Sequence, residues 1–222
     1  FFVYPLPENM PAVAPLPADD NGFVTFASFN KPCKMNDKVL DLWSEVLSAV
    51  PDSKLMLKYR DYFGNDTLRH RLLGRFNDNG ILEDRIILLS ADDDFQDHMA
   101  CYGQADIALD TFPFAGATTT FQALWMGVPV ISLMTDRFVG RMGGGISSHA
   151  GLSELAAETP QAFVDQAAAL AGDLSRLREL RKTLRQRVTQ SDLCDGPALA
   201  ARMEVTFRAM WKAHEAKATG PS

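Results

Sequence analysis

The sequence contains little cysteine and little histidine. Its 222 residues include three cysteines, Cys33, Cys101 and Cys194, and four histidines. An odd number of widely spaced cysteines does not form a disulfide framework, and their spacing is not that of a zinc site. The thiols fit a reduced, cytoplasmic protein, so we expect neither a structural disulfide nor a bound metal.

Long apolar runs and basic clusters are also absent. No apolar run approaches the ~20 residues that a membrane-spanning helix needs, and the first residues, FFVYPLP, lack the basic start of a secretory signal. The net charge is −6, and affinity for a nucleic-acid backbone comes from clustered Lys and Arg. We therefore expect neither a membrane nor a nucleic acid as a partner.

Several common catalytic motifs are missing as well. The sequence has no HExxH motif, no paired-carboxylate motif and no Ser-His-Asp order. The glycines of MGGGIS do not follow a strand in the GxGxxG arrangement, and no lysine stands in a Walker motif. These absences disfavour a dinucleotide dehydrogenase and a P-loop ATPase.

Short apolar runs alternate with amphipathic segments over most of the chain. The runs are rich in β-branched and aromatic residues, and the segments repeat apolar residues at helical spacing. This order predicts an α/β fold, a parallel sheet with helices on both faces. The predicted strands are 23–29, 54–59, 86–89, 107–109 and 130–133; the predicted helices are 37–49 with Asn36 as N-cap, 66–76, 93–104, the segment opened by Thr118 and closed by Gly127, and, after Thr159, 160–170, 173–190 and 197–215.

The chain divides into three predicted parts. Residues 1–22 hold five prolines, which remove hydrogen-bond donors and keep the backbone extended, so we expect a strap or linker without a regular element. Residues 23–216 form the folded domain together with its C-terminal helices, and 217–222 form a frayed tail. Residues 134–148 are rich in glycine. They predict either a flexible wall of a site or a surface loop whose glycines only make turns.

The segment from Ile107 to Leu133 contains a candidate anion site. A strand, a loop with Gly116, a threonine-rich helix start and a second strand follow one another there. The N-terminus of such a helix lies at the carboxyl ends of the parallel strands, where unpaired N–H groups and the helix dipole favour a phosphate. The alternative is that Thr118 only caps the helix.

Three other side chains are candidates for the same site. Lys34 follows the first strand, where its ammonium can neutralise a diphosphate, or it is simply a solvated lysine. His98 lies in the helix before the fourth strand and either contacts a base or phosphate or has a structural role. Gln122 lies one turn into the threonine helix and either reaches a ribose hydroxyl or faces solvent.

Three blocks of sequence carry a resemblance to a known family. They are GFVTFASFNKPCKMNDKVLDLWSEVL, DTFPFAGATTTFQALWMGVPVISL and GLSELAAETPQAFVDQAAAL. Together they are similar to the O-linked N-acetylglucosamine transferase family, and most similar to its bacterial members that carry tetratricopeptide repeats. The similarity extends from about Phe1 to Ala213.

The resemblance implies the C-terminal lobe of a GT-B glycosyltransferase, whose two Rossmann-like lobes bind UDP-N-acetylglucosamine and transfer the sugar to Ser or Thr of proteins without a metal or other cofactor. Lys34 then matches the catalytic lysine that neutralises the diphosphate leaving group, and Lys31 a polar residue beside it. His98 matches the histidine that contacts the uridine. Thr118 and Thr119 match the threonine pair that grips the phosphates.

Two positions depart from the family pattern. Gln122 stands where relatives carry Asp or Glu toward the ribose, and Phe95 stands where they carry a lysine. Glutamine can still bind a hydroxyl, but without charge assistance. A donor such as GDP-fucose or UDP-glucose is therefore an alternative, and so is a degenerate lobe that only binds.

The resemblance also implies that this chain is part of a longer protein. An N-terminal lobe and tetratricopeptide repeats would precede it, and no general base is identifiable in this sequence. We expect the isolated chain to bind a nucleotide weakly and not to turn over.

Overall fold

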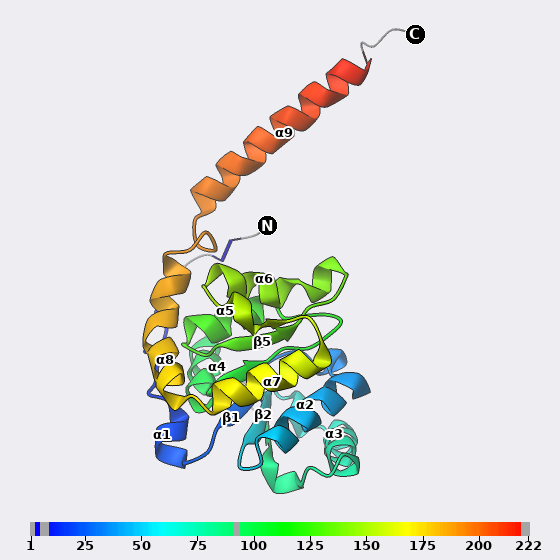
Figure 1. The fold of residues 1–222 in the computed structure, drawn as a ribbon, viewed down its shortest axis with the longest axis vertical. Helices are drawn as coiled ribbons and strands as arrows, with labels where there is room; N and C mark the ends of the chain where they lie inside the picture. The colour runs from blue at the N-terminus through cyan, green and yellow to red at the C-terminus, as the bar shows by residue number, and fades with distance from the viewer. Residues whose placement is uncertain (1–2, 5–8, 91–93, 219–222) are drawn as a thin grey trace.

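The structure, a computed structural model, describes residues 3–4, 9–90 and 94–218 (Figure 1). Six parallel strands form one sheet in the order β3-β2-β1-β4-β5-β6. This confirms the α/β fold with a parallel sheet. The strands are β1 (Thr25–Ser28), β2 (Lys54–Lys58), β3 (Ile86–Leu89), β4 (Ile107–Leu109), β5 (Val130–Leu133) and β6 (Ala156–Ala157).

Helices cover both faces of the sheet. Connections from β1 to β3 run in one direction across the sheet, and those from β3 to β6 run in the other. Right-handed crossovers therefore place the two groups of helices on opposite faces. On one face α2 packs against α3 and α7; on the other α5 packs against α6 and α8 (Figure 1). The α-helices are α1 (Pro17–Asn21), α2 (Asp37–Ala49), α3 (Asp66–Asp78), α4 (Phe95–Ala100), α5 (Thr118–Trp125), α6 (Met142–His149), α7 (Pro160–Ala171), α8 (Leu174–Thr189) and α9 (Gly196–Ala218).

The direction of the connections reverses between β1 and β4, which are neighbours in the sheet. At such a reversal the loops after the two strands separate to opposite faces and leave a crevice, which is where open α/β sheets bind ligands. The loop after β1 carries Lys34, and the loop after β4 leads into Thr118–Thr119 at the start of α5. The topology therefore brings these sequence-predicted residues to one edge of the sheet.

Local capping signals fix several helix boundaries where we expected them. The Asn36 side chain accepts a hydrogen bond from Val39 N at 3.2 Å, and α2 runs from Asp37 to Ala49 as predicted. The Thr159 hydroxyl accepts from Ala162 N at 3.1 Å at the start of α7. Each cap satisfies an N–H group that the first helical turn leaves unpaired.

Three expectations were wrong. The proline-rich segment contains a short helix, α1, which begins at Pro17 because a proline in the first turn needs no N–H partner. The two-residue strand β6 was missed, since two alanines carry no strand pattern. The glycine-rich stretch forms helix α6 from Met142 rather than a loop. The predicted helix start at Asp93 lies outside the described residues, as do 1–2, 5–8 and 219–222 of the predicted strap and tail.

The segment before β1 is held against the C-terminal helices. Tyr4 N donates to Leu193 O at 2.8 Å, and the Arg185 guanidinium donates to Pro11 O at 2.7 Å. Asp106, at the start of β4, accepts from Ala18 N and Thr25 N. These contacts hold the N-terminal segment against α8, the turn that follows α8 and the residue before β4; the domain boundaries themselves stay a prediction.

Helix α9 projects away from the body of the molecule (Figure 1). Along it, Met203, Phe207, Met210 and Trp211 recur at helical spacing and are 44–62% exposed. A stripe of large apolar side chains in water is unusual for a solvated helix face. Among the described residues, no helix is both long enough and apolar enough to cross a membrane.

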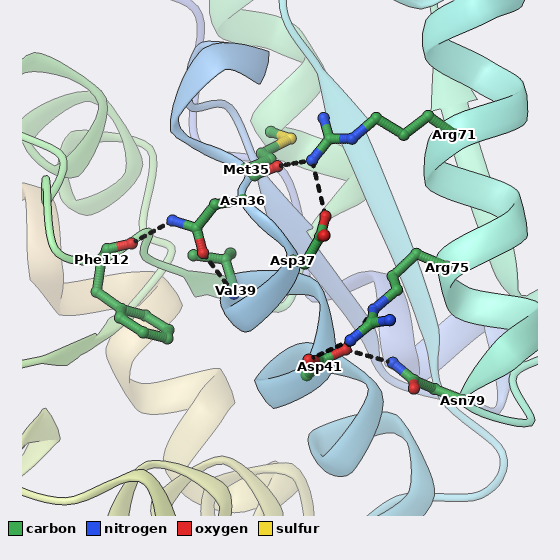
Figure 2. Close-up of polar contacts among 9 residues, drawn as sticks. All are labelled: Met35, Asn36, Asp37, Val39, Asp41, Arg71, Arg75, Asn79 and Phe112. Carbon is green, nitrogen blue, oxygen red and sulfur yellow. Dashed lines mark hydrogen bonds and ion pairs between the residues drawn. The ribbon is translucent and has the colours of Figure 1, made fainter.

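The Asn36 cap has a second contact that predicts a measurable difference in stability. The Asn36 amide also donates to Phe112 O at 3.0 Å (Figure 2). The side chain of the matched cap Asn65 accepts from Leu68 N at 2.9 Å and makes no second hydrogen bond within the described residues. Asn65→Ala should cost about 1 kcal/mol and Asn36→Ala about 2 kcal/mol in the free energy of unfolding, measured by urea titration. Equal losses would show that the contact with Phe112 adds nothing.

Candidate functional site

Lys34 lies in a short turn beyond the end of β1. The turn forms a 3-10 helix, Pro32–Lys34, whose proline begins it and whose last residue is the lysine. The Lys34 ammonium donates to Ala115 O at 2.9 Å and to Asn30 Oδ1 at 3.4 Å, and it lies 4.3 Å from the centroid of the Phe114 ring. Half-burial of the side chain lowers the pKa of Lys34, and the nearby Asp110 carboxylate opposes this shift.

The turn that carries Lys34 is held from two sides (Figure 2). The Arg71 guanidinium, from α3, donates to Met35 O at 2.8 Å and pairs with Asp37 at 3.2 Å. The Asn36 amide joins the turn to Phe112 O in the loop after β4. Contacts with both α3 and this loop restrict the positions that the Lys34 backbone can take.

The N-terminus of α5 lies beside this turn. Its N-cap is Ala117, which makes no side-chain cap, and the first helical hydrogen bond runs from Phe121 N to Ala117 O. The N–H groups of residues 118–120 therefore lie at the positive end of the helix, where no intrahelical partner exists. The interpretation of Thr118 as a mere N-cap is wrong, because Thr118 is the first helical residue and is exposed.

Asn30 connects the lysine to this helix. Its side-chain oxygen accepts from Lys34 Nζ at 3.4 Å and from the Thr119 hydroxyl at 3.3 Å. Lys34 and Thr119, 85 residues apart in the sequence, therefore meet at a single amide oxygen. A fixed cation beside a helix N-terminus is an arrangement suited to a phosphate group.

A buried carboxylate lies beneath these groups. Asp110, directly after β4, is 1% exposed and accepts from Thr111 N at 2.8 Å, Gly116 N at 2.6 Å and the Ser132 hydroxyl at 2.9 Å. Burial raises the pKa of Asp110, and these donors with Lys34 oppose the rise. Sequence reasoning gave no role to Asn30 or Asp110. A signal was present, because each is a polar residue that follows a buried strand at the switch point.

Two further sequence-predicted residues lie at the same edge. The His98 ring, half-buried on α4, meets Phe29 and Tyr102 edge-on, with centroids 5.7 Å and 5.9 Å away. Phe29, Asn30 and Tyr102 line a small cavity together with Asp110, Thr119 and Thr120. Lys31 precedes the turn and is exposed. The structure thus gathers Lys31, Lys34, His98, Thr118 and Thr119 around the carboxyl ends of β1 and β4; their roles stay predictions.

Gln122 has a different environment from the other candidates. It is 8% exposed, and its side-chain oxygen lies 3.5 Å from the Tyr102 hydroxyl that donates to it. Tyr4 reaches it from the N-terminal segment: burial raises the pKa of Tyr4, and a hydrogen bond with Gln122 opposes the rise. Gln122 is thus bonded within the chain, and a contact with ribose stays a prediction.

The glycines of α6 have a packing role. A Cβ on Gly143 would lie 2.0 Å from Asp110 Oδ2 and 2.6 Å from Ser132 Oγ, so only glycine allows α6 to approach the carboxylate. A Cβ on Gly144 would meet the Met134 sulfur at 2.3 Å. Residues 142–149 are a packed helix against the site, so the expectation of a flexible wall or a simple turn-forming loop was wrong for the glycine cluster; residues 134–141 are a loop with a 3-10 turn, Phe138–Gly140.

Histidines, cysteines and carboxylates do not gather into a metal-binding group of three or more anywhere in the described part of the chain. None of the three cysteines forms a disulfide. Positive charge beside Asn30 comes from the Lys34 ammonium and from the N-terminal end of the α5 dipole.

Comparison with solved structures defines the class of the fold. A mutant of the O-GlcNAc transferase of Thermobaculum terrenum superposes with a TM-score of 0.84 at 33% identity, over 97% of this chain and 40% of that one. The C-terminal domain of a group 1 glycosyl transferase family protein from Francisella tularensis superposes at 0.58 with 15% identity, over 81% of this chain and 93% of that one. The fold is that of the C-terminal lobe of a GT-B glycosyltransferase.

The sequence identifies the family within that class. The profile of Glycosyl transferase family 41 matches residues 14–203, and this chain belongs to that family. The probable UDP-N-acetylglucosamine–peptide N-acetylglucosaminyltransferase SPINDLY of Hordeum vulgare is 40% identical over 207 residues, which are 93% of this chain and 22% of the barley protein. The UDP-N-acetylglucosamine–peptide N-acetylglucosaminyltransferase of Caenorhabditis elegans is 29% identical over 86% of this chain and 16% of its own length. The chain thus spans about a fifth of these curated relatives.

The close approach of α6 predicts a large effect for a small substitution. Gly143→Ala places a methyl group against buried Asp110 and Ser132, which have little room to move, so it should cost about 1–3 kcal/mol in the free energy of unfolding. Gly145→Ala is the matched control in the same helix, because a Cβ there meets nothing within 4 Å. It should be neutral or stabilise by up to about 1 kcal/mol, since alanine favours helix over glycine. Urea denaturation measures both; equal effects would contradict the packing argument.

Proposed function

We propose that this chain is the donor-binding lobe of a glycosyltransferase that moves N-acetylglucosamine from UDP-N-acetylglucosamine to Ser or Thr of proteins. The observation that carries this proposal is the meeting of the Lys34 ammonium and the Thr119 hydroxyl at Asn30, beside the α5 N-terminus. A diphosphate bound there has a cation on one side and backbone donors on the other. Membership of Glycosyl transferase family 41 and the names of the relatives support the choice of donor and acceptor.

Each sequence-predicted residue has a role in this proposal. Lys34 faces the diphosphate, and the N–H groups and hydroxyls of Thr118 and Thr119 bind its oxygens. His98 contacts the uridine from the aromatic cluster with Phe29 and Tyr102. Lys31 supplies an exposed polar group beside Lys34, and Gln122 supports the ribose side of the site.

The reaction that follows is a displacement at the anomeric carbon. The acceptor oxygen forms a bond to that carbon while the bond to the diphosphate oxygen breaks, and UDP leaves with the electron pair. Negative charge therefore grows on the β-phosphate, where Lys34 and the start of α5 stabilise it without first having to reorient. The proton of the acceptor hydroxyl goes to a general base, which we place outside this chain.

The rest of the catalytic machinery belongs to another part of the protein in this proposal. The chain spans about a fifth of its relatives, and the exposed apolar stripe on α9 offers a surface for a further domain. We propose that an N-terminal lobe completes the site, that tetratricopeptide repeats precede it, and that the whole acts in the cytoplasm. We also propose that the reaction needs no metal, because Lys34 and the helix dipole supply the positive charge that the leaving group requires.

A second candidate donor follows from two positions. Phe95, which is 48% exposed on α4, stands at a position where the resembling family carries a lysine. Gln122 accepts a hydrogen bond from the Tyr102 hydroxyl of the same chain. Both substitutions remove a charge near the nucleoside, so GDP-fucose or UDP-glucose is the alternative to UDP-N-acetylglucosamine as donor. The other alternative is a lobe that binds a nucleotide without taking part in catalysis.

Nucleotide binding by this chain tests the phosphate site. Lys34→Ala should weaken UDP about tenfold or more, because a hydrogen bond to a charged group contributes about 1.5–3 kcal/mol. Lys38→Ala is the matched control, since Lys38 is exposed on α2 close by in sequence. Calorimetric titration with UDP, GDP and their sugars measures affinity and also separates the candidate donors.

Four results would count against this proposal. Unchanged UDP affinity in Lys34→Ala would remove the phosphate site, and preference for GDP would replace UDP-N-acetylglucosamine with GDP-fucose. Measurable sugar transfer by the chain alone would contradict the need for another lobe. Transfer by the complete protein that stops with EDTA and returns with a divalent metal would contradict metal independence.

The lowered pKa of Lys34 predicts a pH dependence of binding. Desolvation disfavours its charged form in the free protein, whereas a bound diphosphate favours that form and raises the pKa. Affinity for UDP is therefore highest below the pKa that Lys34 has in the free protein, and it falls as the pH rises through that pKa. Lys34→Arg stays charged above this range, so its affinity should fall less between neutral and alkaline pH. Parallel titrations of both proteins check this, and identical pH profiles would contradict it.

A further inference from the structure

The Asp110 carboxylate is fully buried, yet its contacts all lead toward the phosphate site or the elements that border it. Oδ1 accepts from Thr111 N, Gly116 N and the Asn30 amide, the last at 3.2 Å, and Oδ2 accepts from Ser132. A buried charge is costly unless donors surround it. The carboxylate therefore holds the loop after β4 and the residue after β1 in fixed positions.

The carboxylate determines which way the Asn30 amide points. An ionised carboxylate only accepts hydrogen bonds, so the NH₂ of Asn30 must face Asp110, where it also lies 3.5 Å from Ser28 Oγ. The amide oxygen then faces outward and accepts from both Lys34 and Thr119. The reverse orientation would point two N–H donors at the Lys34 ammonium.

The same carboxylate also sets the second acceptor of Lys34. Its bond to Gly116 N, at 2.6 Å, anchors the loop in which Ala115 O accepts from the lysine at 2.9 Å. A Cβ on Gly116 would lie 2.6 Å from the Thr119 hydroxyl and 3.0 Å from Asp110, so the loop is closely fitted there. Both acceptors of the ammonium are thus oriented by Asp110, although within the described residues no hydrogen bond or ion pair joins the lysine to the carboxylate.

We propose that Asp110 is a positioning residue for the donor diphosphate: through Asn30 and the Gly116 amide it holds the Lys34 ammonium and the Thr119 hydroxyl where the phosphate oxygens bind. This inference rests on the proposed function. In this inference the buried Asp110 does not contact the substrate, whereas Lys34 and the N-terminus of α5 do.

The test compares UDP with uridine, which lacks phosphate, by NMR titration of this chain. Asp110→Asn should raise the Kd for UDP about tenfold or more, as expected for a misplaced charged contact, and change that for uridine less than about twofold. In a Lys34→Ala background the same substitution should weaken UDP clearly less than it does in the unsubstituted chain, because residues that act through one another are not additive and only the contact through Thr119 is left to lose. Ser132→Ala removes the Oδ2 contact on the side away from Asn30 and should leave the ratio of the two affinities unchanged.

Asn30→Ala provides a second variant if Asp110→Asn does not fold, as judged by urea denaturation. It removes the amide between the carboxylate and the lysine and should show the same selective loss for UDP and the same non-additivity with Lys34→Ala. Equal weakening of UDP and uridine, or full additivity with Lys34→Ala, would overturn the positioning role. Equal affinity of the unsubstituted chain for UDP and uridine would instead overturn the proposed phosphate site itself.

Discussion

The candidate site depends on the compensation of one buried charge. Asp110 is 1% exposed and follows β4 at the point where the sheet connections reverse. A carboxylate in such a place must be surrounded by donors, since an unpaired buried charge costs several kcal/mol or more. The donors come from the loop after β4, from Asn30 after β1 and from Ser132 in β5. Three neighbouring strands are thereby tied at their carboxyl ends, and α6 can approach only because Gly143 has no side chain.

Much of the fold was predictable from local signals, and the exceptions have physical reasons. Caps such as Asn36 and Thr159 mark helix starts because their side chains satisfy N–H groups within three residues along the chain. Helix α6 was missed because glycine disfavours helix by itself; the helix is stabilised by packing against β5 and Asp110, which no local pattern records. Strand β6 was missed because its two alanines form a strand only by pairing with β5.

The site was predictable in position more than in detail. Parallel topology alone brings the residues after β1 and β4 together, so Lys34 and Thr119 could be placed at one edge. The position of Asn30 and Asp110 at the same edge was foreseeable in the same way, but their hydrogen bond was not, because it joins residues 80 positions apart and depends on the register of two strands. The surroundings of Gln122 were equally inaccessible: helical spacing gives the face of α5, but the Tyr102 hydroxyl that meets it comes from a different element.

The arrangement also explains how a lysine so close to a carboxylate can remain available to an anion. A direct ion pair with Asp110 would have to be broken before a diphosphate could bind. The Asn30 amide lies between them instead, and the ammonium is bonded to two neutral oxygens, Asn30 Oδ1 and Ala115 O. Hydrogen bonds between a cation and neutral acceptors are weaker than those to an anion, so a phosphate can replace them with a net gain. The carboxylate still acts at a distance, because its negative charge favours the charged form of Lys34 and so opposes the lowering of the Lys34 pKa by desolvation. In the proposed site Asp110 thus favours the charged form of the lysine and fixes its two acceptors, while the Asn30 amide keeps the acid out of the position assigned to the diphosphate.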